Sequence, residues 1–429
     1  MKKTFFLLGL LCSLFTCFSQ ERWTVCNAPT FNSRVDDIFM VDTHTGYAVC
    51  GDGKIVKTTD GGNNWQLLLQ DANIYCRSVE FMNAQKGFVG GFVFGGINEN
   101  ILRETTDGGA TWKDLTPLID TRAYGGICGL AIPDNKTIYG CGNWFENAGY
   151  IVKSTDGGDS WSFIDMSAYT TSIIDMCFIN KDTGFVTGNG PAPLQTAVIL
   201  YTTNGGISWE YKYQHNESNE YCWKIQRLTN KIFFASVESG LPGQPVIILK
   251  STDGGMSWGS HTVYTSDYNI EGIGFINEKQ GWTGGGLDFS FKTEDGGITW
   301  DTVHFCSEMN RVFRVNDTLL FATGTEIWKY RGNGITPVTP DTAHNAWLQC
   351  YPNPANEYLA IAVYLKTRTR LLVTIYDSKG SRIANIENAD KDAGTYYYKF
   401  NTSKVSPGMY TVFLKTHDDK RTKQVIVVH

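Results

Sequence analysis

The sequence predicts an all-β chain, a β-propeller followed by a small Ig-like β-sandwich, on three observations. The phrase Asp-Gly-Gly with Trp three residues later occurs six times, once with Asn in place of Asp. Successive copies start 47, 49, 48, 49 and 42 residues apart, a spacing typical of four-stranded propeller blades. The chain after residue 330 lacks the phrase. The copies are Asp60–Trp65, Asp107–Trp112, Asp156–Trp161, Asn204–Trp209, Asp253–Trp258 and Asp295–Trp300.

Each repeat holds four short apolar runs separated by Gly, Asp and Asn. This pattern predicts a meander of four antiparallel strands, with the repeated phrase between the third and the fourth. In the first repeat the runs are residues 35–41, 46–50, 54–57 and 65–69.

A seventh unit, residues 311–330, has only three such runs. Residues 21–25 resemble the missing fourth strand because Trp23 stands among polar and β-branched residues, as in the repeats. Pairing this segment with residues 326–330 would close the ring and remove two exposed strand edges. The sequence therefore favours seven blades, with six as the alternative.

The N-terminus has the pattern of a secretory signal peptide. Lys2 and Lys3 precede an apolar run at residues 5–18, and cleavage is expected after Ser19 or Gln20. The expected organisation is a signal peptide at 1–19, a propeller at 20–330, a Gly/Pro/Thr linker at 331–347 and a sandwich at 348–429. No later segment has the ~20 consecutive apolar residues of a transmembrane anchor.

Charge and cysteine usage narrow the function classes. Residues 21–339 contain 23 Lys and Arg against 35 Asp and Glu, which argues against nucleic acid or anionic lipid as a partner. Nine of the eleven cysteines would remain after signal cleavage, and most lie within apolar strand patterns. No C-x-x-C pair and no His pair at metal spacing occurs, so the sequence predicts no metal and no cofactor.

The repeated phrase has the chemistry of a hairpin turn. Its Asp can accept backbone N–H groups, its Gly residues allow positive φ, and its Trp can pack beside the turn. The phrase resembles the Asp-box, or BNR repeat, of sialidase, sortilin and photosystem II assembly-factor propellers, where it is a structural turn away from the binding face. A structural role is thus expected for Asp60, Trp65, Asp107, Trp112, Asp156, Trp161, Asn204, Trp209, Asp253, Trp258, Asp295 and Trp300.

The last 82 residues resemble the type A sorting domain of the Bacteroidetes type IX secretion system. This resemblance implies export through the periplasm and the outer membrane, with the tail as the partner of the secretion machinery and the protein secreted or held at the outer surface. The residues that carry it are Tyr351, Pro352, Asn353, Pro354, Gly380, Gly408 and Lys423.

The face opposite the repeated turns is the expected binding face. Connections between second and third strands lengthen there, and aromatic residues recur where the inner strands begin. Loops longer than closure requires commonly carry binding residues, although the rings could instead wedge between blades. The ligand-binding candidates are Tyr75, Tyr124, Trp144, Phe145, Glu146, Tyr169, Tyr221, Glu238 and Tyr268.

The preferred function is a secreted or surface scaffold that binds a protein or glycan and has no catalytic residues. The alternative is a sialidase- or xyloglucanase-like glycoside hydrolase that uses two loop carboxylates, because such enzymes need two acids across one site. The acids available in the loops are Glu99, Glu146, Glu238 and Asp288. The chain lacks the Phe/Tyr-Arg-Ile-Pro motif of sialidases before its repeats, which favours binding over catalysis.

Overall fold

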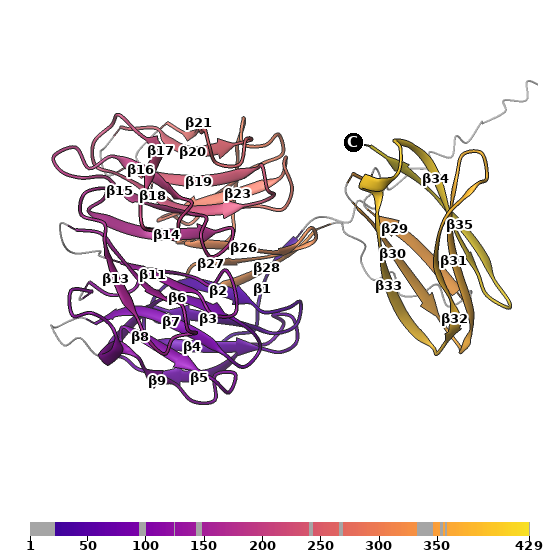
Figure 1. The fold of residues 1–429 in the computed structure, drawn as a ribbon, viewed down its shortest axis with the longest axis horizontal. Coiled ribbons are helices and arrows are strands. Elements are labelled where there is room, and N and C mark those ends of the chain that lie inside the picture. The colour runs from indigo at the N-terminus through magenta and orange to yellow at the C-terminus, as the bar shows by residue number, and fades with distance from the viewer. Residues whose placement is uncertain are drawn as a thin grey trace, which may run out of the picture. The chain divides into compact units, whose positions relative to one another are not determined.

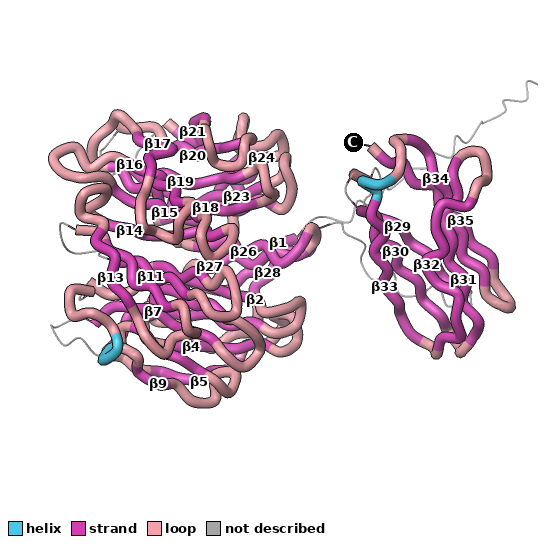
Figure 2. Tube along the Cα trace, viewed as in Figure 1, coloured by secondary structure: helices cyan, strands magenta, loops and turns pink. Residues whose placement is uncertain are grey.

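The computed structural model describes residues 22–93, 100–123, 125–142, 148–239, 243–265, 269–332, 346–351, 355–356 and 358–428. The chain separates into two compact units, Met1–Gly332 and Asn333–His429. Both are built from strands (Figure 1). Helical turns are confined to two short 3-10 segments among the described residues, η1 (Thr116–Leu118) and η2 (Thr402–Lys404) (Figure 2).

The described part of the first unit forms seven four-stranded antiparallel sheets. Six of them are consecutive meanders in which the strands pair in chain order. These are β2 (Val35–Met40), β3 (Gly46–Cys50), β4 (Lys54–Thr58) and β5 (Gln66–Gln70); β6 (Ile74–Phe81), β7 (Gly87–Val93), β8 (Leu102–Thr105) and β9 (Lys113–Asp114); β10 (Gly129–Ala131), β11 (Ile138–Gly142), β12 (Tyr150–Ser154) and β13 (Ser162–Asp165); β14 (Ser172–Phe178), β15 (Gly184–Asn189), β16 (Ala197–Thr202) and β17 (Glu210–Gln214); β18 (Glu220–Arg227), β19 (Phe233–Ser239), β20 (Val246–Ser251) and β21 (Gly259–Tyr264); β22 (Ile270–Phe275), β23 (Gly281–Gly285), β24 (Ser290–Thr293) and β25 (Asp301–Val303).

The remaining sheet joins the two ends of the unit. Its strands are β26 (Arg311–Asn316), β27 (Leu319–Thr323), β28 (Ile327–Arg331) and, on its outer edge, β1 (Arg22–Val25). Trp23 pairs with Tyr330, so the predicted pairing of the N-terminal strand with the last unit is confirmed. The Trp23 ring stacks on Phe305 with centroids 4.5 Å apart and meets Trp282 edge-on at 5.4 Å. This sheet has no Asp-box turn. The burial of aromatic side chains around Trp23 stabilises the pairing of β1 with β28 instead.

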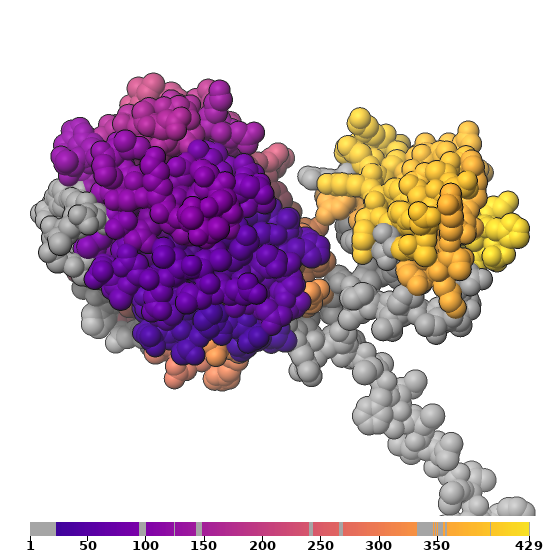
Figure 3. Space-filling model, turned by 90° about the horizontal axis from the view of Figure 1, so that it is seen from below, coloured from indigo at the N-terminus to yellow at the C-terminus, as the bar shows by residue number. Residues whose placement is uncertain are grey.

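The first strand of each sheet lies at the centre of a ring. Strand β2 contacts β6, and contacts continue through β10, β14, β18, β22 and β26 back to β2. Apolar clusters combine residues from neighbouring sheets: one contains Ile38 and Ala48 together with Phe321 and Ile327. The early sheets, indigo to purple, pack side by side into a continuous surface (Figure 3). The all-β propeller prediction is therefore confirmed.

Two faces of this ring can be distinguished by their hydrogen bonds. Each Asp-box turn bonds to the hairpin between the first two strands of its own sheet, as Gly61 N–H does to the His44 carbonyl at 2.8 Å. We call this end of the ring the box face. The inner strands begin at the opposite end, together with the connections between second and third strands, and we call that end the loop face.

Lysines fasten some sheets to the box of the following sheet. The Lys57 ammonium donates to the Gly108 carbonyl at 2.8 Å, and its Nζ lies 5.2 Å from the Tyr47 ring centroid. Lys153 and Lys250 make the matching bonds to Gly205 and Gly296, each at 2.9 Å. The Asp-box turns are thus bonded to neighbouring sheets as well as to their own.

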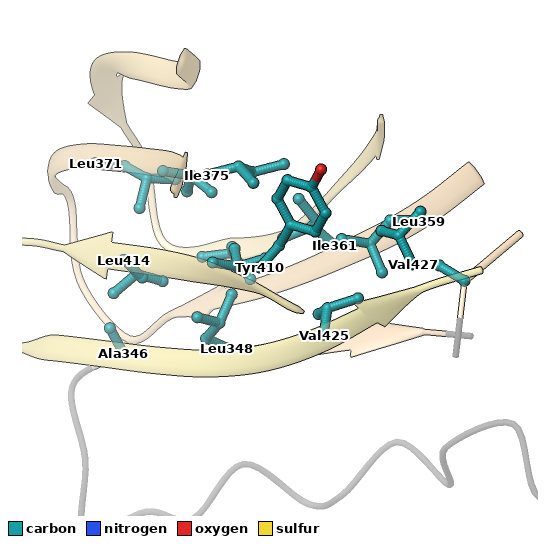
Figure 4. Packing of buried hydrophobic residues seen from close by; sticks show 14 of the residues in the cluster. Ala346, Leu348, Leu359, Ile361, Leu371, Ile375, Tyr410, Leu414, Val425 and Val427 are labelled. Carbon is teal, nitrogen blue, oxygen red and sulfur yellow. The ribbon is translucent and has the colours of Figure 1, made fainter. Parts of the chain in front are cut away.

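The second unit is a sandwich of two antiparallel sheets around one apolar core. One sheet contains β29 (Ala346–Tyr351), β30 (Tyr358–Leu365) and β33 (Gly394–Asn401); the other contains β32 (Arg382–Lys391), β31 (Thr369–Asp377), β34 (Gly408–Lys415) and β35 (Lys420–Val427). Leu348, Ile361, Leu414 and Val425 meet between the sheets (Figure 4).

Three details differ from the sequence-based expectation. Strand β29 begins at Ala346, within the span expected to be linker. Strand β32 has no fully buried side chain, so its polar sequence gave no apolar alternation to detect. In the second repeat the outer strand ends at Asp114, and a 3-10 turn containing Pro117 follows because proline has no N–H to donate to a ladder.

Candidate functional site

The Asp-box turns use their polar groups internally. The Asp60 Oδ1 accepts the backbone N–H groups of Asn63 and Asn64 at 3.0 and 2.9 Å and the Thr58 hydroxyl at 2.9 Å. These bonds, led by those from Asn64, hold the pKa of Asp60 at about 2. Gly62 has φ of +80°, and a Cβ there would lie 2.3 Å from the Phe321 ring, so the turn requires glycine.

The fourth box shows that the charge of the Asp is dispensable for this geometry. The Asn204 amide oxygen accepts the Ser208 N–H at 3.0 Å and the Thr202 hydroxyl at 3.0 Å, as the carboxylates do in the other boxes. In the last four boxes the Trp adds an indole N–H bond to the second box glycine, as Trp161 does to Gly158 at 3.0 Å. The buried indole nitrogens of Trp65 and Trp112 make no such bond. These groups are therefore engaged within their own turns.

A network of charges crosses the ring near the loop face. The Arg34 guanidinium donates to Asp36 at 2.9 Å and to both Glu271 oxygens at 2.7 and 2.8 Å. Arg77 donates to Asp36 at 2.5 Å, and Asn310 bonds to Arg77 and Glu271. We call these five residues the loop-face network. They come from β2, β6, β22 and the segments before β2 and β26, so the network ties together sheets that are far apart in the sequence.

The loop-face network is deeply buried. The side chains of Asp36 and Arg77 are 0% and 3% exposed, whereas that of Arg34 is 18% exposed. The Arg77 guanidinium also lies 5.4 Å from the ring centroid of Trp223 on β18. Ion pairs buried to this degree need hydrogen bonds on both partners. Both arginines donate to Oδ1 of Asp36, whereas Oδ2 of Asp36 is buried without a hydrogen-bond partner among the described residues.

Two of the sequence-based candidates, Tyr75 and Glu238, adjoin this network. The half-buried Tyr75 ring stacks on Phe92 at 5.7 Å, and burial together with the charge of the nearby Asp36 raises the pKa of the Tyr75 hydroxyl. Burial raises the pKa of Glu238 to about 8, and the nearby Glu271 carboxylate adds to the shift. Glu238 therefore keeps its proton at neutral pH beside carboxylates that are ion-paired.

The other two described candidates are placed differently. Tyr221 pairs with Glu238 across β18 and β19 and meets Trp223 edge-on at 6.3 Å, so it adjoins the same region. Tyr169 packs 6.2 Å from Tyr211 on the neighbouring outer strand, and its carbonyl accepts the Tyr211 hydroxyl. Tyr169 thus takes the wedging position between strands that was the alternative for these rings.

Five candidates lie outside the described residues: Tyr124, Trp144, Phe145, Glu146 and Tyr268. Asp288, an alternative catalytic acid, is described and exposed. The structure thus places Tyr75 and Glu238 beside the loop-face network, with Tyr221 paired to Glu238, whereas Tyr169 packs against Tyr211.

A second group of charges crosses the ring closer to the box face. Arg311 on β26 pairs with Asp175 on β14 at 2.7 Å and with Asp37 on β2 at 3.2 Å. Asp175 also accepts the Ile225 backbone N–H at 3.1 Å, and Asp37 accepts the Val79 backbone N–H at 3.0 Å. Beneath this group a cavity of about 260 Å³ lies among the C-terminal ends of the inner strands.

Sequence reasoning missed both groups of charges. Arg34, Asp36, Arg77 and Glu271 stand next to or within apolar runs, where a polar residue normally marks the solvent side of a strand. The available signal was their recurrence at the start of inner strands in several repeats. That signal could have indicated a polar centre of the ring, but not which side chains pair.

The described residues contain no group of three or more His, Cys, Asp or Glu side chains arranged to hold a metal ion. The nine cysteines from Cys26 onward are all described, and none forms a disulfide. No described helix is long and apolar enough to cross a membrane.

In the second unit, the sorting-domain residues Tyr351, Gly380, Gly408 and Lys423 lie on or beside strands. Gly380 closes the turn after β31 with φ of +79°, and its N–H donates to the Asp377 carbonyl at 3.0 Å. Pro352, Asn353 and Pro354 lie outside the described residues.

Comparison with known families agrees with both units. Residues 16–162 and 159–266, together more than half of the chain, match the family described as photosynthesis system II assembly factor YCF48. This chain belongs to the YCF48 family. Residues 349–428 match the secretion system C-terminal sorting domain, so this YCF48-family propeller carries a sorting tail of the type IX kind.

Individual relatives support the same assignment. The photosystem II assembly lipoprotein Ycf48 of Synechococcus sp. (strain CC9902) is 23% identical over 297 residues, 66% of this chain and 79% of the relative. YCF48 from Cyanidioschyzon merolae superposes with a TM-score of 0.56 at 18% identity, covering 72% of this chain and 98% of that one. A YCF48 structure bound to D1 peptide superposes with a TM-score of 0.53 at 18% identity, covering 72% and 96%.

Proposed function

We propose that this chain is an exported, non-enzymatic scaffold whose loop face binds an extended peptide segment of a partner protein. The observation that carries the proposal is the arrangement of Tyr75, Tyr221 and Glu238, which are partly exposed above the buried loop-face network. Rigid aromatic side chains on a fixed polar base are typical of binding surfaces, because little conformational entropy is lost when the ligand binds.

Charge favours a peptide over a neutral sugar. Arg34 is partly exposed, and Glu238 can ionise when a cation approaches it, so the site offers both signs of charge to a ligand. A relative with the same fold is bound to a peptide. The acidic propeller suits a segment that includes basic side chains.

The sorting tail supports the location of this activity. We infer that the type IX machinery handles residues 348–429 and that the propeller acts at the outer surface or after release. The peptide partner would therefore be a protein of the cell envelope, the surface or the surroundings.

The test uses the full chain on matched peptide and glycan arrays, followed by titration of the best ligand. Tyr221→Ala should weaken peptide binding by about tenfold, the usual effect of removing an aromatic contact. Tyr264→Ala is the matched control because Tyr264 is 40% exposed on the outer strand β21. Glycan binding without peptide binding would refute the ligand class, and equal binding by the two variants would refute the location.

Glycoside hydrolysis is the second candidate function, favoured by one observation. Glu238 is held protonated while Glu271 is paired with Arg34, and two carboxyl groups in different protonation states are what acid–base hydrolysis requires. A hydrolase would release reducing sugar from a polysaccharide panel and lose that activity in Glu238→Gln. Absence of turnover across the panel would leave the binding proposal alone.

A further inference from the structure

The cavity at the box face is lined by both apolar and charged side chains. The apolar ones include Met176, Phe178, Phe313 and Pro133, and the charged ones include Lys224, Glu80 and Arg227. Its volume, about 260 Å³, is close to the lower end of small-molecule sites. The lining residues come from six inner strands, β6, β10, β14, β18, β22 and β26, so the cavity is a feature of the closed ring.

Two of the four cationic groups that line the cavity are paired with carboxylates. Arg311 is neutralised by Asp37 and Asp175. Arg314 pairs with Asp317 and also donates to the Ile276 carbonyl at 2.9 Å. These two arginines shape the cavity without leaving a full charge for a ligand.

Lys224 is different. The residue is only 3% exposed, and its ammonium has no hydrogen bond or ion pair to any described residue. Burial lowers the pKa of Lys224, and the charge of Asp175 opposes that shift only in part. A buried ammonium without a partner is costly, and an anion in the cavity would remove that cost.

The remaining titratable groups of the cavity also favour an anionic ligand. Arg227 donates to the Asn230 side chain and has no carboxylate partner among the described residues. Burial raises the pKa of Glu80 well above its usual range, and Asp37 adds to the shift. The raised pKa favours the neutral form of Glu80, which can donate a hydrogen bond, so Glu80 does not oppose an anion beside Lys224 and Arg227 as an ionised carboxylate would.

We propose that this cavity is a second binding site, for a small organic carboxylate with an apolar body. The carboxylate would accept from the Lys224 ammonium, and the apolar part would lie against Phe178, Phe313 and Met176. The site is independent of the loop-face function because none of its residues belongs to the loop-face network.

The first experiment uses the unmodified full chain and isothermal titration calorimetry. The probe is 3-phenylpropionate, and its neutral isostere 3-phenylpropanamide has the same shape without the charge. We expect the acid to bind at least about tenfold more tightly than the amide, as for loss of a charge-assisted hydrogen bond. Equal binding of the two, or binding of neither, would overturn the proposal.

Variants locate the site. Lys224→Met removes the charge and keeps the apolar stem, and should reduce binding of 3-phenylpropionate by about tenfold or more. Lys231→Met, an exposed lysine at the end of the same sheet, is the matched control and should bind as the unmodified chain does. Thermal unfolding of both variants reports whether they are folded, and retained binding in folded Lys224→Met would refute the assignment.

A zwitterion is the competing ligand class. Phenylalanine carries an ammonium group that could pair with the Glu80 carboxylate if Glu80 ionises. Tighter binding of phenylalanine than of 3-phenylpropionate, with that preference lost in Glu80→Gln, would overturn the carboxylate proposal. Tyr221→Ala should leave 3-phenylpropionate binding unchanged, which separates failure of this site from failure of the peptide site.

Discussion

Buried charged side chains line the centre of the ring at both faces, but they are paired near one face and not all paired near the other. Near the loop face Arg34, Asp36, Arg77 and Glu271 are bonded to one another, with Asp36 and Arg77 almost completely buried. Near the box face Lys224 is equally buried but has no partner among the described residues, and a cavity lies beside it. Paired buried charges act as structure, whereas an unpaired one beside a cavity indicates a place for a ligand.

The comparison makes its strongest prediction at Asp36, which neutralises two arginines. Asp36→Ala leaves Arg34 and Arg77 buried without their shared carboxylate and should lower the free energy of unfolding by about 3–5 kcal/mol. Urea unfolding followed by tryptophan fluorescence measures this change. The control is Asp288→Ala, an exposed site where a change within about 0.5 kcal/mol is expected. Similar losses at both positions would contradict the structural role of the loop-face network.

Glu238 tests whether burying a carboxyl group at the loop face lowers the stability of the folded protein at neutral and higher pH. Its folded pKa of about 8 lies above the ordinary value of 4.5, so the folded protein loses stability relative to the unfolded chain as pH rises from about 4.5 to about 8. Glu238→Gln lacks this loss and should be more stable by up to about 4 kcal/mol at pH 8 and equal near pH 4.5. Unfolding curves at the two pH values decide it; a difference that does not grow with pH contradicts the assignment.

Lys224 should behave in the reverse way to Asp36. Lys224→Met removes a charge that has no partner, so stability at pH 7 should be unchanged or higher by up to about 1 kcal/mol. The folded pKa of Lys224 lies below 10.5, so the unmodified chain gains stability as pH rises from that lowered pKa toward 10.5. Thermal unfolding from pH 7 to 10 should show this gain in the unmodified chain and not in the variant. A large loss at pH 7 would instead place Lys224 among the paired charges.

The smallest effect is expected at an exposed box. Hydrogen bonds from Ser160 lower the pKa of Asp156, so its contribution to stability is present above about pH 4 and declines as pH falls through the lowered pKa. Asp156→Asn should behave as Asn204 does and change neutral stability little, with the difference from the unmodified chain shrinking toward pH 2. Acid titration by circular dichroism measures this. A large loss at pH 7 would mean that the box needs charge as well as an acceptor oxygen.

Local regularity explains what could be predicted from the sequence. The Asp-box is a contiguous phrase repeated at a nearly constant interval, so the sheets and the box turns follow directly from it. The ring closure could be predicted because Trp23 repeats the pattern of an outer strand. Strand β32 and the charges at the ring's centre could not, since β32 has no buried face and residues such as Arg34 and Glu271 meet only in the closed ring.

The candidate site was predicted only in part for the same reason. Tyr75, Tyr221 and Glu238 were found because loop length and aromatic recurrence are visible locally. The cavity at the box face was missed because Lys224 reads as one polar residue in an alternating strand. Its isolation depends on which acids the other inner strands place near it.

The closure of the ring by β1 has a consequence for how quickly this protein matures. The bond from Thr24 to the Lys329 carbonyl joins residues 305 positions apart, so the first strand made is the last to find its partner. Contacts between residues this far apart form slowly, because the entropy cost of ordering the intervening chain must be met before the contact contributes any stabilising free energy. Until then the β28 edge of the final sheet stays open, and the time spent in that state sets the interval during which neighbouring chains can pair with it.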